Sequence, residues 1–132
     1  MRLVVIESPL RGRVPGWCPR WLAPLVERIA RARNRAYAKR CMLDALSRGE
    51  APYASHLLFD QRGLLDDANH EQRLAGIEAG FAWGHKAQLR AVYCDRGISY
   101  GMKLGMQQRP AGQLLEFRQL RPRRQWRPED VQ

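Results

Sequence analysis

The chain has 132 residues, with 23 Lys or Arg against 13 Asp or Glu, so its formal charge is +10. This length predicts a single domain, and the hydrophobic content of 45% excludes an intrinsically disordered chain. No stretch approaches the ~20 apolar residues that a membrane-spanning helix needs, and the apolar run near the N-terminus is too short for a signal peptide. We therefore expect neither a membrane span nor a signal peptide.

The three cysteines are widely spaced and form no C-x-x-C pair: they are Cys18, Cys41 and Cys94. Such spacing favours buried thiols in a reducing compartment over a disulfide framework or a zinc site. We therefore expect a cytoplasmic protein with no metal site and no bound cofactor. There is also no G-x-G-x-x-G, P-loop or G-x-S-x-G segment, so redox, kinase and hydrolase-triad chemistry have no support.

The first half of the chain predicts a strand, a long helix and a second strand. Residues 2–7 are a β-branched apolar run, which is typical of a buried strand. Apolar residues then recur at helical spacing over residues 22–46, and Gly49 is expected to end that helix. Residues 51–55 predict a short strand, from whose end residues 56–59 lead away.

The second half predicts two more helices and two more strands. Asn69 with Gln72 resembles a capping box at the start of a helix over residues 69–83, in which we expect four residues to be buried: Leu74, Ile77, Phe81 and Ala82. Residues 89–94 predict a third strand, Ser99 is expected to cap a helix that runs to residue 108, and residues 114–117 predict a fourth strand. Residues 1–120 then form the domain, and residues 121–132 an Arg- and Pro-rich tail.

This βαβαβαβ order predicts a parallel sheet of about four strands with helices on both faces, a small doubly wound α/β fold of the Rossmann or flavodoxin-like kind. Such folds place their site at the carboxyl ends of the strands, where the strand order reverses. The candidate site residues that follow the predicted strands are Ser8, Arg11, Ser55, His56, Asp66, Asp67, Asp95, Gly97 and Ser99.

Several of these residues, and Glu78 of the predicted helix over residues 69–83, also have a purely structural interpretation. Ser99 is a helix cap in one reading and a ligand-binding hydroxyl at a helix N-terminus in the other. His56 is either a hydrogen-bonded structural residue or a functional one, and Asp66 and Asp67 are either ligands or favourable charges at a helix start. Glu78 lies two turns after Glu71, so both face the site or both face solvent.

Five segments of the chain form a pattern when they are taken together. They are Ile6-Glu7-Ser8-Pro9-Leu10-Arg11-Gly12, Pro52-Tyr53-Ala54-Ser55-His56-Leu57-Leu58, Leu65-Asp66-Asp67, Gly76-Ile77-Glu78-Ala79-Gly80 and Asp95-Arg96-Gly97-Ile98-Ser99-Tyr100-Gly101-Met102. In this order they resemble the nucleoside 2-deoxyribosyltransferase superfamily, in particular its small phage and prophage members, and the likeness extends over roughly residues 2–120.

The resemblance implies cleavage or exchange of the N-glycosidic bond of a 2′-deoxynucleoside or its 5′-monophosphate. It implies that Ser99, Gly101 and Met102 belong to the phosphate- or sugar-binding turn, with Ser8 opposite, and that a homodimer or higher homo-oligomer is formed. The family's nucleophilic Glu falls on Gly105, which carries no side chain. An oxocarbenium-like transition state needs a carboxylate, and the candidates that remain are Asp95, Asp67 and Glu78.

Three functions follow as hypotheses. The first is a nucleoside or nucleotide N-glycosidase or deoxyribosyltransferase, and the second is a nucleotide- or metabolite-binding protein that has lost catalysis. The third, which we favour least, is a binder of nucleic acid or of a partner protein through the Arg-rich segment 28–40 and the tail. Most of those cations are expected on a solvated helix face, and only Arg11 and Arg96 lie at strand ends where a phosphate is expected.

Overall fold

The computed structural model describes residues 1–121 and contains one sheet of four parallel strands in the order β2-β1-β3-β4. The strands are β1 (Arg2–Glu7), β2 (Glu50–Tyr53), β3 (Leu89–Tyr93) and β4 (Leu114–Arg118). The helices are α1 (Ala23–Ser47), α2 (Ser55–Phe59), α3 (His70–Gly84) and α4 (Tyr100–Gln107). The predicted doubly wound α/β fold is confirmed.

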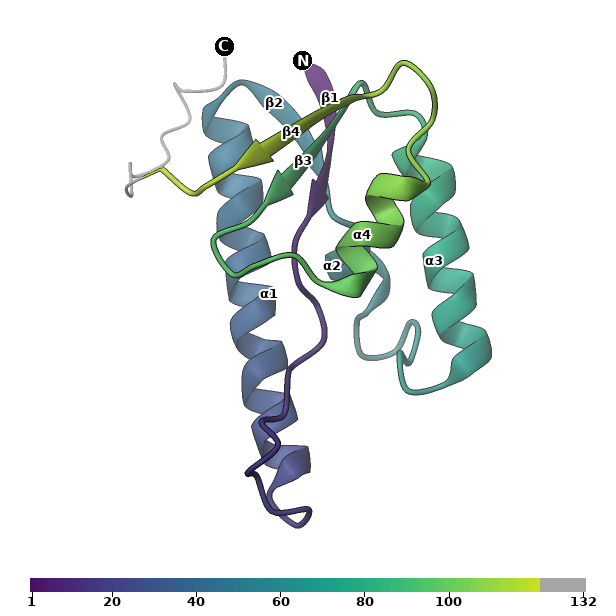
Figure 1. Ribbon diagram of the computed structural model, residues 1–132. Coiled ribbons are helices and arrows are strands. Elements are labelled where there is room, and N and C mark those ends of the chain that lie inside the picture. The colour runs from purple at the N-terminus through teal and green to yellow at the C-terminus, as the bar shows by residue number, and fades with distance from the viewer. Residues whose placement is uncertain (122–132) are drawn as a thin grey trace.

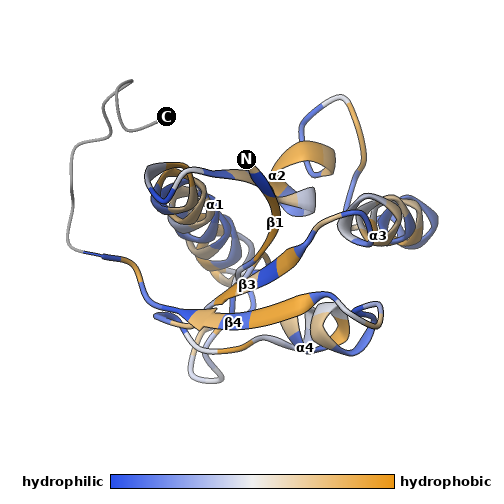
Figure 2. Cartoon of the chain, turned by 90° about the horizontal axis from the view of Figure 1, so that it is seen from above, coloured by the Kyte–Doolittle hydropathy of each residue, from blue (hydrophilic) through white to orange (hydrophobic). Residues whose placement is uncertain are grey.

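Helices cover both faces of the sheet. Helix α1 lies on one face, and α3 and α4 lie on the other (Figures 1 and 2). Because side chains alternate along a strand, Val4 and Ile6 of β1 pack with Tyr37 and Cys41 of α1 in the main core. Their neighbours Val5 and Glu7 therefore point to the opposite face, towards α3 and α4.

The predicted burial on α3 is partly wrong. Leu74 is 46% exposed and Ala82 is exposed too, whereas Ile77 and Phe81 are half-buried. The inward face of α3 instead carries glycines at four-residue spacing. A Cβ on Gly80 would lie 2.9 Å from the Cβ of Ser55 in α2, and one on Gly84 would lie 3.3 Å from a methyl of Val5. The helix packs through its backbone, so the larger side chains flanking this face stay partly in solvent.

The second strand is shorter than predicted, because the chain turns into α2 at Ser55. The helix boundaries otherwise agree closely with the sequence. Gly49 follows α1 with a φ of 77°, a left-handed conformation that favours glycine. Asn69 caps α3 by accepting a hydrogen bond from the Gln72 amide (3.1 Å), but the Gln72 side chain accepts from the Asp66 amide, so only half of the capping box forms.

The predicted C-terminal tail lies outside the described residues, apart from Arg121. Within residues 1–121 no helix is both long and apolar enough to cross a membrane.

Candidate functional site

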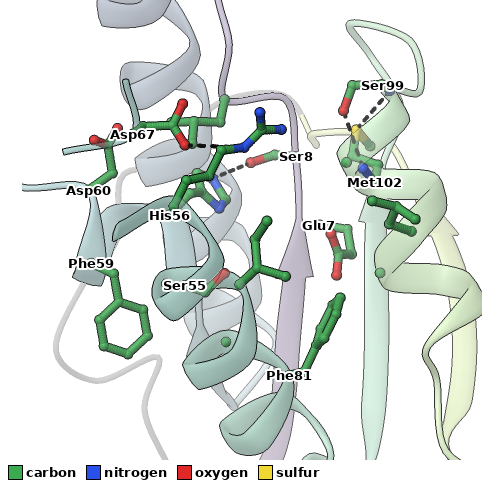
Figure 3. A pocket seen from close by; sticks show the side chains of 18 of the residues that line it. Glu7, Ser8, Ser55, His56, Phe59, Asp60, Asp67, Phe81, Ser99 and Met102 are labelled. Carbon is green, nitrogen blue, oxygen red and sulfur yellow. Dashed lines mark hydrogen bonds and ion pairs between the residues drawn. The ribbon is translucent and has the colours of Figure 1, made fainter. Parts of the chain in front are cut away.

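A cavity of about 360 Å³ lies on the α3–α4 face of the sheet, above the carboxyl end of β1 (Figure 3). The strand order reverses between β1 and β3, because the chain passes from β1 to β2 on one side and reaches β3 on the other. Ligands of doubly wound folds bind at that point, and this volume falls within the range of small-molecule sites. The polar groups and rings in its lining include Glu7, Ser8, Arg11, Tyr53, Ser55, His56, Phe59, Asp67, Phe81, Arg90 and Ser99.

The carboxylate of Glu7 lies at the end of β1 in the cavity lining, and its side chain is only 16% exposed. It forms an ion pair with Arg90 of the neighbouring strand, and the Arg90 side chain is 2% exposed. Burial raises the pKa of Glu7 to about 7, against the opposing effect of the Arg90 guanidinium. A carboxyl group with this pKa is partly protonated at neutral pH, as acid–base carboxylates in enzymes are.

Ser8 and His56 meet at the wall of the cavity (Figure 3), where the Ser8 Oγ and the His56 Nε2 are hydrogen-bonded at 2.9 Å. Ser8 comes directly after β1, and His56 comes from the first turn of α2. Burial lowers the pKa of His56 to about 4, so the imidazole is neutral at pH 7. The pair offers hydrogen-bonding groups without a charge. Nearby, the buried hydroxyl of Tyr53 has no hydrogen-bond partner within residues 1–121.

The N-terminus of α4 forms another side of the cavity. Ser99 is the N-cap, and its Oγ accepts a hydrogen bond from the Met102 amide at 3.3 Å. Gly101 has no atom within 4 Å of its Cβ position except the Ser99 Oγ, at 4.0 Å, so the first turn has room for a ligand. Free amides at a helix start suit phosphate or sugar oxygens.

Ion pairs on two aspartates hold the loop that borders the cavity. Asp67 contacts Arg31 at 2.8 Å, Arg11 at 3.1 Å and Arg73 at 3.7 Å. Asp60 contacts Arg35 at 3.5 Å and also Arg31 at 3.8 Å. Four guanidinium groups therefore surround two carboxylates, and this excess positive charge favours an anionic ligand.

The structure brings eight of the residues singled out from the sequence into the cavity lining: Ser8, Arg11, Ser55, His56, Asp67, Ser99, Gly101 and Met102. The other four do not line it. Asp95 accepts hydrogen bonds from the Tyr37 hydroxyl and the Leu120 amide, Asp66 is exposed and accepts from the Ala68 amide, Glu78 is exposed on α3, and Gly97 lies in the turn before α4. Arg96 also lies apart, over the ring of Tyr37.

Sequence reasoning missed Glu7 and Arg90. The sequence places Glu7 at the end of one predicted strand and Arg90 within another, otherwise apolar, strand. A charged residue in a buried strand needs a partner, and this could have pointed to both, because the two strands belong to one small sheet. Most cations of segment 28–40 are predicted on a solvated helix face, yet Arg31 and Arg35 reach the loop beside the cavity.

The family model described as "Domain of unknown function (DUF7768)" matches residues 2–114, which include every residue of the cavity lining. The chain belongs to this family. No curated protein and no solved structure matches this DUF7768 chain. Within its described residues, no group of three or more His, Cys, Asp or Glu side chains is arranged to hold a metal ion.

Proposed function

We propose that the chain binds a nucleoside or nucleoside 5′-monophosphate in this cavity and cleaves or exchanges its N-glycosidic bond. The carrying observation is the composition of the cavity, in which largely buried carboxylates, Glu7 among them, lie among hydroxyl groups and aromatic rings. Glycosidic cleavage proceeds through an oxocarbenium-like transition state that a carboxylate stabilises. The resemblance to the nucleoside 2-deoxyribosyltransferase superfamily supports the same reaction.

Each part of such a ligand has a matching surface. The rings of Phe59 and Phe81 offer faces on which a base stacks. Hydroxyls from Ser8, Ser55 and Ser99 suit the sugar. The α4 N-terminus and the arginines beside the cavity suit a phosphate.

The test is incubation of the purified protein with a panel of 2′-deoxynucleosides, ribonucleosides and their 5′-monophosphates, followed by chromatography for free base. We expect base release from at least one member. A parallel reaction with a second free base distinguishes exchange from hydrolysis. If no member of the panel releases base at any pH between 5 and 8, the proposed reaction is wrong.

One observation favours a second candidate, a nucleotide-binding protein without catalysis. Gly105 stands where the resembling family has its nucleophile. Calorimetric titration with the same panel separates the two candidates, because a pure binder gives heat with a nucleotide and releases no base. A cytoplasmic location and a homo-oligomeric state remain predictions that accompany either candidate.

A further inference from the structure

We propose that Glu7 is the carboxylate that acts on the anomeric carbon, from a position beside α4 that is open only because residue 105 is glycine. This inference rests on the proposed function and assigns its central residue. The nucleophile of the resembling family falls on position 105 in α4, whereas this inference assigns the reacting group to the end of β1.

The first support is the fit between Glu7 and Gly105. A Cβ on Gly105 would lie 2.7 Å from the Glu7 Cδ and 2.9 Å from its Oε2, and it would approach Oε1 still more closely. Real Cβ atoms essentially never make contacts under 3.0 Å. The Glu7 carboxylate therefore occupies the space in which a side chain at position 105 would begin.

The second support is the rigid scaffold behind the carboxylate. The Arg90 guanidinium that pairs with Glu7 also donates from Nε to the Gln113 Oε1 at 3.0 Å. The Gln113 amide in turn donates to the backbone carbonyls of Gly84, at 2.7 Å, and Ala87, at 2.8 Å. This chain of hydrogen bonds fixes the direction of Arg90, and hence of Glu7, before a ligand arrives. Reactive groups are most effective when they are held in this way.

The third support comes from the other carboxylates of the lining. Asp67 contacts three guanidinium groups and Asp60 contacts two. Both lie in the loop between α2 and α3, and their ion pairs with Arg31 and Arg35 attach that loop to α1. Glu7 has one ionic partner, and it lies between β1 and α4 with Phe81 directed towards it (Figure 3). Among the lining carboxylates of residues 1–121, it is the one best placed to meet a sugar.

The chemistry balances in two steps. A Glu7 Oε attacks the anomeric carbon while the C–N bond breaks. The electron pair of the C–N bond leaves with the base, which takes a proton from solvent. Water then attacks the same carbon, gives a proton back to solvent, and releases the Glu7 carboxylate as the ester C–O bond breaks. The net reaction consumes one water, and a second base in place of water gives exchange. The carboxylate must be ionised to attack, and the Arg90 guanidinium favours that form.

The experiment compares the wild type with Glu7→Gln and with Glu27→Gln, a control that makes the same change at an exposed carboxylate of α1. Circular dichroism checks folding, calorimetry measures ligand affinity, and chromatography measures base release. We expect Glu7→Gln to lower kcat by at least about 100-fold while the Kd changes by less than about threefold. The control is expected to keep the wild-type kcat.

A second measurement on the wild type does not depend on the variant folding. A 2′-fluorinated nucleoside slows breakdown of the glycosyl ester, and peptide mass mapping then locates the adduct, which we expect on Glu7. An adduct on another carboxylate, or an active Glu7→Gln variant with near wild-type kcat, overturns the inference and leaves the proposed function intact. A wild type that cleaves nothing in the panel overturns the proposed function and this inference with it.

Discussion

Replacing Gly105 with alanine tests the contact on which the assignment of Glu7 depends. The added methyl would lie 2.7 Å from the Glu7 Cδ, and ordinary van der Waals contact begins at 3.4 Å. Because Oε1 lies closer still, the carboxyl group or the helix must therefore move by at least about 0.7 Å. On the side of Glu7 the movement works against the ion pair with Arg90, which the Gln113 hydrogen bonds hold in place.

Two opposing terms set the size of the effect. Overpacking in a well-filled interior costs about 1–3 kcal/mol, whereas alanine is favoured over glycine inside a helix by about 1 kcal/mol. We expect Gly105→Ala to destabilise the wild type by about 0–2 kcal/mol. In a Glu7→Ala/Arg90→Met background, which removes both charges together, the clash is absent and the same change should stabilise by about 0.5–1 kcal/mol. The coupling between the two sites is then about 0.5–3 kcal/mol.

Urea unfolding of the four proteins, followed by circular dichroism, measures this coupling. Gly101→Ala is the matched control on the same helix, because its Cβ position has open space. We expect the control to give the same small change in both backgrounds. If Gly105→Ala stabilises both backgrounds equally, the Glu7 carboxylate does not occupy the space beside Gly105, and the reasoning is refuted.

Three further predictions concern pH, capping and packing. The folded-state pKa of Glu7 is raised from 4.5 to about 7, so its contribution to stability is present below pH 4.5 and lost as pH rises through 7, by at most about 1.4 kcal/mol per pH unit. The pKa of His56 is lowered from 6.5 to about 4, so its contribution to stability is present above pH 6.5 and lost as pH falls to 4. The unfolding free energies of Glu7→Gln and His56→Gln, measured between pH 4 and 8, should therefore change with opposite slopes relative to wild type. Parallel curves would contradict both pKa shifts. Ser99→Ala removes the α4 cap and should cost about 0.5–2 kcal/mol in urea unfolding, whereas Ser99→Asp should recover most of it. Gly80→Ala should cost about 0–2 kcal/mol, because its methyl would meet Ser55 at 2.9 Å while alanine is favoured in a helix by about 1 kcal/mol. A stabilisation of about 1 kcal/mol would contradict the close packing of α3 on α2.

The sequence by itself determined the order and type of the main elements. The signals for these elements are local: hydrophobic runs at residues 2–7 and 89–94, helical periodicity between residues 22 and 46, and the cap at Ser99. Local patterns can be recognised without knowledge of the tertiary contacts. The alternation of strands and helices then leaves few topologies. That is why the edge of the sheet and six residues of its cavity could be named in advance from the strand ends: Ser8, Arg11, Ser55, His56, Asp67 and Ser99. Gly101 and Met102 were named through the family resemblance.

The tertiary structure decided which of the edge residues share a cavity and which carboxylate lies inside it. Asp95 follows β3 as predicted, but the Tyr37 hydroxyl from α1 engages it on the other face of the sheet. Glu7 enters the cavity because strand alternation, the nearby Arg90 and the missing side chain of Gly105 act together. These three residues lie far apart in the chain, so their fit is a property of packing and appears only when the strands and α4 are in place. The net charge did not predict the charged groups beside the cavity, because the sequence does not show which arginines form ion pairs with Asp60 and Asp67.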